Sequence, residues 1–200
     1  SAYPNFVVRQ SPDGRHWAPL VSAFRRPQSL HFMTQLSGGD VVVVDYYNLN
    51  NNGFGTLYRM PPALPPGQPA FYDAFATGAP EIGRTTGSGL VYGFTFPFQP
   101  VGLRSITPFT TGEDEAAPVG SNGIRVGKFT HPSAAPGNDL LVVWTPGPAN
   151  DLNRPSPIPY YDAGLYLIPN GETINSPAGL VTIKNNPAYN EAWPRAVVPY

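Results

Sequence analysis

The segments VGKFT (residues 126–130), LLVVWT (140–145), AGLYLI (163–168) and GLVTIK (179–184) decide the fold of this chain. Each is short and rich in β-branched, aliphatic or aromatic residues, which is typical of a β-strand. The stretches between them are rich in Pro, Gly, Asn and Ser, which favour turns. Four short antiparallel strands in series are the pattern of one blade of a β-propeller.

The composition predicts a loop-rich, all-β protein. Of 200 residues, 26 are proline and 21 are glycine, and they lie between the apolar runs without a period. No window of helix length keeps an apolar stripe at helical spacing without meeting Pro or Gly, which are costly inside helices. The 41% of hydrophobic residues supply the material for a core.

The charge balance and the absence of cysteine exclude several classes of function. Twelve Lys and Arg against 13 Asp and Glu give a formal charge of −1, which offers no footprint for nucleic acid. No apolar run approaches the roughly 18 residues of a membrane span. Without cysteine there are no disulfides, thiolate metal sites, Cys nucleophiles or covalently attached haem. A chain poor in Lys and rich in Pro and Gly favours an exported protein, periplasmic or extracellular.

An earlier part of the chain repeats the strand pattern. His31 is followed nine residues later by Asp40 and a valine run, and His131 is followed eight residues later by Asp139 and an aliphatic run. A repeat of this kind indicates that each unit is one supersecondary structure. The later strands match in residues 55–58 with 164–166, and in residues 103–107 with 180–183.

We therefore predict one β-propeller segment with two full four-stranded blades and a partial blade at each end. The alternation in residues 90–96 allows an extra strand or hairpin arm, and residues 196–198 look like the opening strand of a further blade. Two blades do not close a ring and leave open sheet edges, so we expect the remainder of a longer chain or other protein subunits as partners. The predicted divisions are a partial blade at 1–28, a blade at 29–109 with an insertion at 61–100, a blade at 126–184 and a partial blade at 189–200.

Several motifs carry a family resemblance. SPDG (11–14), GLYLI (164–168) and the LVTI strand before EAWP (191–194) resemble the repeat of TolB-type propellers. GKFTHPS (127–133), followed by LLVV and DAGLY (162–166), is similar to the propeller domain of hydrazine synthase alpha-subunit-like proteins. The resemblance implies an exported propeller that supports or docks other domains. In that family the haem centres depend on Cys-x-x-Cys-His motifs, which this chain lacks, so no cofactor is predicted.

Two histidines are candidates for ligand binding. His31 and His131 occupy matching positions near the start of the innermost strand of each predicted blade, where both could face a central channel. Two histidines are too few for a closed metal site. The alternative is that each ring is structural and hydrogen-bonded to the turn that follows.

The string DYYNLNNNGFG (residues 45–55) supplies the other candidates, which are Asp45, Tyr46, Tyr47 and Asn50. Its alternating Asn residues imitate a calcium loop, but an uncharged first ligand and Arg59 at the position of the bidentate Glu exclude an EF-hand. A looser calcium site remains an alternative to an ordered connection in which Asn satisfies neighbouring backbone groups. The tyrosines line a pocket or pack a blade interface, and no metal site is predicted.

No assembled catalytic set is found in the sequence, and no catalytic residue is assigned. We expect a non-catalytic propeller segment of a larger exported protein, which acts as a scaffold or binding surface for partner chains or a ligand. The alternative is an enzyme or a subunit of a redox complex, with a metal or carbohydrate site at the propeller channel. Fold alone does not decide between them.

Overall fold

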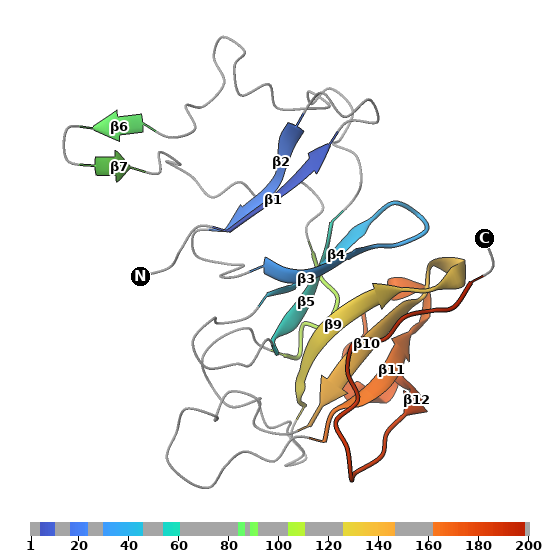
Figure 1. The fold of residues 1–200 in the computed structure, drawn as a ribbon. Coiled ribbons are helices and arrows are strands. Elements are labelled where there is room, and N and C mark those ends of the chain that lie inside the picture. Colours follow the sequence, from blue (N-terminus) through green and yellow to red (C-terminus); the bar gives the residue numbers. More distant parts are fainter. Residues whose placement is uncertain are drawn as a thin grey trace, which may run out of the picture.

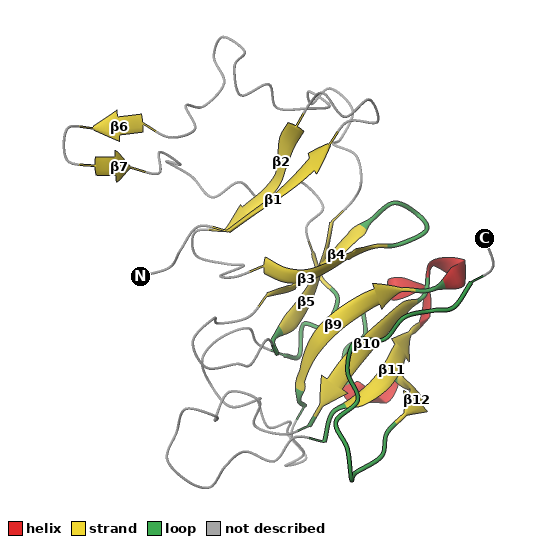
Figure 2. Cartoon of the chain, viewed as in Figure 1, coloured by secondary structure: helices red, strands yellow, loops and turns green. Residues whose placement is uncertain are grey.

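The computed structural model describes residues 5–10, 17–23, 30–45, 54–60, 84–86, 89–91, 104–110, 126–146 and 162–198. Within these ranges the chain is all-β, as predicted, and its helical segments are three short 3-10 turns (Figure 2). The turns are η1 (Pro136–Asn138), η2 (Pro169–Gly171) and η3 (Pro177–Gly179). No helix in the described part is long and apolar enough to cross a membrane.

Two four-stranded antiparallel sheets form the centre of the structure (Figure 1). Sheet 1 has the order β3-β4-β5-β8, and sheet 2 has the order β12-β11-β10-β9. Strands β1 and β2 form one separate hairpin, and β6 and β7 form another. The strands are β1 (Asn5–Gln10), β2 (Trp17–Ala23), β3 (Leu30–Gln35), β4 (Val41–Asp45), β5 (Thr56–Met60), β6 (Arg84–Thr86), β7 (Gly89–Val91), β8 (Arg104–Ser105), β9 (Lys128–Ala134), β10 (Leu140–Thr145), β11 (Gly164–Ile168) and β12 (Val181–Lys184).

The strand predictions are confirmed in type but corrected at several bounds. Residues 126–127 are not part of β9, and Gly179, predicted to begin a strand, lies in η3. β9 continues through Pro132, which the sequence marks as the start of a turn. Because Pro132 lies at an irregularity in the pairing of β9 with β10, its missing N–H removes no regular ladder bond. Residues 196–198 are not a strand, since no strand in the described ranges pairs with them.

The first strand of each sheet contains a bulge at the same place. In sheet 1, Phe32 and Met33 lie between the pairs His31 with Val44 and Thr34 with Val42. In sheet 2, the two residues that follow Thr130 lie between its pair with Val143 and the pair of Ser133 with Leu141. Each bulge thus sets two residues against one, which bends the strand and re-aims a side chain.

These registers correct the predicted match of His31 with His131. Val44 pairs with Leu57 as Val143 pairs with Leu165, so the two sheets superpose with His31 on Thr130. His131 is therefore equivalent to Phe32, and both adopt positive φ angles of 44° and 50°. Asp40 follows Phe32 at the same spacing as Asp139 follows His131, so this match needs no gap. The predicted match of His31 with His131 required a gap of one residue.

The two sheets share one core but contribute opposite faces to it. We call the side of each sheet that carries Val44 or Val143 face A, and the other side face B. Alternation along a strand puts successive side chains on opposite faces. Face A of sheet 1 packs against face B of sheet 2 (Figure 1). The buried cluster contains Val42, Val44 and Leu57 from face A of sheet 1, and Phe129, Leu140, Val142, Tyr166 and Ile168 from face B of sheet 2.

A polar junction fixes the turns of the two sheets against each other. The guanidinium of Arg59, on β5, is only 9% exposed and pairs with the carboxylate of Asp40. Its Nη1 donates to the carbonyls of Asn170 and Gly171 at 3.0 and 2.8 Å, and to Oε1 of Glu172 at 3.1 Å. Since these acceptors belong to η2 and the residue after it, Arg59 ties sheet 1 to sheet 2 and sets how the sheets meet.

Candidate functional site

The structure describes three of the six predicted ligand residues, His31, Asp45 and His131. His31 pairs with Val44 and so lies on face A of sheet 1, whereas Asp45, which is buried, lies on face B. His131 lies in the bulge of β9. Tyr46, Tyr47 and Asn50 lie outside the described residues. Among the residues that the structure describes, no three His, Cys, Asp or Glu side chains come together as a metal site would require.

His131 instead lies within an aromatic stack. Its ring centroid is 4.2 Å from that of Phe32 and 4.0 Å from that of Trp193. Phe32 and Trp193 also meet edge to face at 5.5 Å. The stack joins the bulges of both sheets to the segment that follows β12. Trp193 is 60% exposed, so one face of the stack is open to solvent.

All three residues of this stack have left-handed backbone conformations. Phe32, His131 and Trp193 have φ angles of 50°, 44° and 56°. Such angles are uncommon for residues other than Gly, Asn and Asp, and each costs about 1 to 3 kcal/mol. Strain of this kind persists where the surroundings enforce it and gathers at functional sites. The bulges of β3 and β9 impose these angles on Phe32 and His131 and bring the two rings together.

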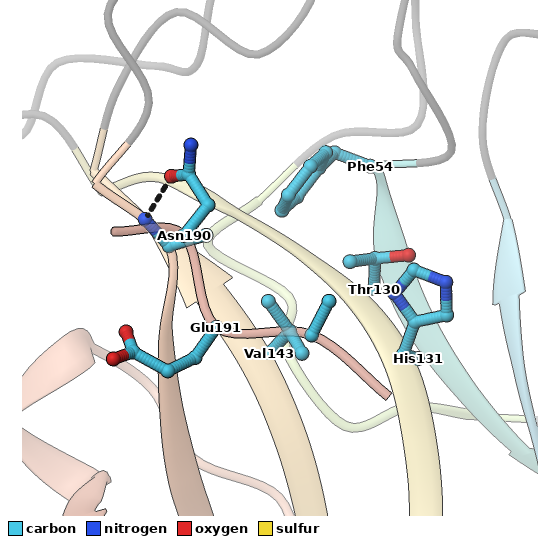
Figure 3. Close-up of a pocket in the computed structure, with 8 residues that line it drawn as sticks. Phe54, Thr130, His131, Val143, Asn190 and Glu191 are labelled. Atoms are coloured by element: carbon cyan, nitrogen blue, oxygen red, sulfur yellow. Dashed lines mark hydrogen bonds between the residues drawn. The ribbon is translucent and has the colours of Figure 1, made fainter. Parts of the chain in front are cut away.

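A cavity of about 170 Å³ lies beside the stack, against face A of sheet 2. Thr130 and His131 form one wall, Val143 of β10 forms the floor, and Phe54, just before β5, lies opposite (Figure 3). Residues 190–192 close the remaining side. This segment is held in place because Asn190 Oδ1 accepts from the Ala163 amide at 3.0 Å and the Glu191 amide donates to the Ala163 carbonyl at 2.8 Å.

Two polar atoms of the cavity wall lack hydrogen-bond partners among the described residues. They are the hydroxyl oxygen of Thr130 and Nδ1 of His131. Thr130 is only 1% exposed, so water does not reach it from the surface. A buried polar group without a partner costs about 1 to 3 kcal/mol. Neither atom presents accessible surface to the cavity, so both lie behind its wall.

Partial burial of the rings lowers the pKa of both described histidines, although His31 as a whole residue is exposed. It lowers the pKa of His131 below the ordinary value of 6.5, and the positive charge of Arg195 lowers it further. Burial also lowers the pKa of His31. A neutral imidazole carries one donor and one acceptor nitrogen.

The carboxylate of Glu191 does not face the cavity, although the residue lines it (Figure 3). Its Oε1 lies 4.0 Å from Nζ of Lys184, and its Oε2 accepts from the Asn186 amide at 3.4 Å. The charge is thus directed toward the end of β12. The interior of the cavity is left mostly apolar.

Sequence reasoning selected His131 but missed its neighbours. Phe32 and Thr130 have no motif of their own, and Trp193 is separated from His131 by all of β10, β11 and β12. The sequence does contain one indication of the correct match. Phe32 precedes Asp40 by the same number of residues as His131 precedes Asp139, so an alignment without a gap matches Phe32 with His131. The contact of Trp193 with either bulge residue depends on tertiary packing alone.

The chain matches no protein-family model, no curated protein and no solved structure.

Proposed function

We propose that this chain is a segment of a β-propeller that acts as a non-catalytic binding scaffold and docks another four-stranded unit on face A of sheet 2. The observation that supports the proposal most strongly is the use of opposite faces in the contact between the two sheets. A contact between unlike faces of equivalent units is head-to-tail, and such contacts repeat until a ring closes or an array ends.

Face A of sheet 2 has the chemistry that this repetition needs. Leu141 and Leu165 are the equivalents of Val42 and Leu57, which are fully buried in the contact between the sheets. In sheet 2 both leucines are only partly buried, as is Leu167 beside them, whereas Val143 on the same face is fully buried and lines the cavity with residues 190–192. A row of aliphatic side chains on a sheet face is the surface against which a second sheet packs.

The occupant in this proposal is a further blade, which belongs either to the remainder of a longer chain or to another protein subunit. Among the described strands β12 is the edge of sheet 2, and its Val181 and Ile183 are 48% and 55% exposed, which agrees with such a neighbour. An open apolar edge strand is a liability that proteins usually cover. The resemblance to TolB-type and hydrazine synthase alpha-subunit-like propellers supports the same assembly, in the periplasm or outside the cell.

The mass of the natural protein tests this proposal. We expect native mass spectrometry to find a polypeptide or complex larger than the 21.5 kDa of this chain. In a complex, Leu165→Glu should release the docked unit, because it places a charge in an apolar contact. Ala178→Glu, at an exposed position in η3, is the control and should leave the complex intact. A natural product that is a 21.5 kDa monomer contradicts the proposal.

A further inference from the structure

We infer that residues 190–196 are the first strand of the unit that docks on face A of sheet 2. This segment binds, along its free backbone edge, the second strand of that unit, which the same polypeptide supplies after residue 200. The inference rests on the proposed docking and names the part of the docked unit that this chain contributes. It starts from the registers of the two sheets, which make Gly55, just before β5, equivalent to Ala163, just before β11.

The segment after β12 meets sheet 2 as β9 meets sheet 1. The Phe129 amide donates to the Gly55 carbonyl at 2.8 Å. The Glu191 amide donates to the Ala163 carbonyl at the same distance. Because the two carbonyls are equivalent, Glu191 takes the place of Phe129. β9 lies across β3, β4 and β5 of sheet 1, and residues 190–192 lie against β10 and the residue before β11 (Figure 1). The side chains differ, since Phe129 is buried and the carboxylate of Glu191 turns toward β12, but the backbone contact is the same.

The aromatic stack continues this equivalence. His131 and Trp193 each lie two residues after the equivalent amides, and Phe32 is the equivalent of His131 in sheet 1. The rings of Phe32 and His131 lie 4.2 Å apart with an angle of 49° between their planes. The rings of His131 and Trp193 lie 4.0 Å apart at 47°. A buried proline follows both His131 and Trp193. Nearly the same step thus leads from sheet 1 to sheet 2 and from sheet 2 to this segment.

The backbone of this segment has an edge that no described strand occupies. In sheet 2, Thr130 and Ser133 of β9 pair with β10. Their equivalents are Ala192 and Arg195, which are both exposed. No strand in the described ranges pairs with residues 190–198. A row of unpaired N–H and C=O groups is a template for another strand.

Sheet 2 indicates the side chains that the partner strand carries. Its own second strand, β10, contributes Leu140 and Val142 to the core that it shares with face A of sheet 1. The equivalent strand of the docked unit therefore has aliphatic residues at alternate positions. These residues would cover Leu141 and Leu165, which are partly buried on face A of sheet 2.

The order of the strands indicates where the partner strand comes from. In sheets 1 and 2 the second strand pairs with the first and follows it in the sequence. Only a short turn separates the two, residues 36–40 in sheet 1 and residues 135–139 in sheet 2. A third unit of the same kind takes its second strand from the polypeptide that directly follows its first.

Hydrogen exchange of the natural protein tests this inference, with the 200-residue chain as the reference. The amides of residues 192–196 should exchange about tenfold or more slowly in the natural protein, because a partner strand protects them. The amides of residues 185–189, which precede the proposed strand, should exchange alike in both. The mass of the natural polypeptide itself should exceed 21.5 kDa.

A pair of variants at one residue tests the backbone pairing. Arg195→Pro in the natural protein should abolish the protection, because it removes the amide at the position equivalent to Ser133, which pairs with Leu141. Arg195→Ala keeps the amide, so it is the matched control and should leave the protection unchanged. Neither variant should change the melting temperature of the 200-residue chain, in which Arg195 is exposed.

The outcomes separate this inference from the docking on which it rests. Fast exchange at residues 192–196 in a natural protein in which Leu165 is covered would overturn the inference and leave the docking standing. Fast exchange together with an exposed Leu165 would contradict both. Protection that Arg195→Pro leaves intact would overturn the pairing. A 21.5 kDa chain whose residues 192–196 pair with a separate subunit would overturn the assignment of the partner strand to the same polypeptide.

Discussion

Arg59 shows how a single side chain determines the relation between the sheets. Its guanidinium satisfies Asp40 on one side and three acceptors of residues 170–172 on the other. Arg59→Met should cost about 3 kcal/mol, because it leaves Asp40 and two carbonyls without their donor. Chemical denaturation measures the loss. Arg104→Met is the control, since Arg104 is 43% exposed and bonds only to Glu172 among the described residues; its expected cost is below about 1 kcal/mol.

Two glycines have nearly the same φ angle but different surroundings, so substituting each by alanine distinguishes the cost of backbone strain from the cost of steric overlap. Gly127 and Gly137 have φ angles of 74° and 73°. A Cβ on Gly127 would overlap the carbonyl oxygen of Thr145 and the indole nitrogen of Trp144, whereas a Cβ on Gly137 would meet no atom within 4 Å. We expect Gly137→Ala to cost about 1 kcal/mol and Gly127→Ala more than about 3 kcal/mol. Equal losses in thermal unfolding would show that overlap at Gly127 is relieved.

The neutral histidines predict how stability depends on pH. Burial lowers the folded pKa of His131 and of His31 below 6.5, so the unfolded chain binds protons first as the pH falls. Their contribution to stability is complete above the unfolded pKa and is lost as the pH drops below it. The free energy of unfolding should decrease between pH 7.5 and 5.5. His131→Asn, which tolerates the left-handed angle, should reduce this decrease; an unchanged pH profile argues against a buried neutral ring.

At the scale of the element, equivalent strands of the two sheets should respond differently to the same change. Leu57 of β5 and Leu165 of β11 hold matching positions, but Leu57 is fully buried and Leu165 is partly exposed. Leu57→Ala should cost about 3 kcal/mol, as a large-to-small change in a core does. Leu165→Ala should cost about 1 kcal/mol or less in the isolated chain. Similar losses in urea denaturation would mean that face A of sheet 2 is already covered.

The strands were readable from the sequence because alternating or continuous apolar runs end at Pro, Gly and Asn. β10 and β11 lie within one residue of their predicted bounds. Bulges were not readable, since one extra residue in a strand changes the register without changing the composition. For this reason the sequence predicts a turn at Pro132, where β9 continues, and a match of His31 with His131, which the bulged registers do not support. The stack of Trp193 on His131 depends on a chain path that local patterns do not encode.

At the scale of the whole molecule, the head-to-tail contact explains why apolar residues remain partly exposed on sheet 2. Each sheet has two apolar faces. The contact between unlike faces covers face A of sheet 1 and face B of sheet 2, and it leaves face B of sheet 1 and face A of sheet 2 outside the contact. Val43 and Met60, on face B of sheet 1, are fully buried. On face A of sheet 2, Leu141, Leu165 and Leu167 are only partly buried, although Val143 is fully buried beside residues 190–192. The two ends of the pair therefore differ, and the end formed by sheet 2 is the one at which we propose that another unit docks.

Cysteine labelling of the natural protein tests this central claim most directly, because the chain has no cysteine of its own. Leu165→Cys should react quickly with a maleimide in the isolated 200-residue chain and slowly in the natural assembly. Leu57→Cys, in the shared core, should be protected in both, and Val197→Cys, at a residue 99% exposed, reports reactivity without burial in the isolated chain. Fast labelling of Leu165→Cys in the natural assembly would contradict the account, since it would leave face A of sheet 2 without an occupant.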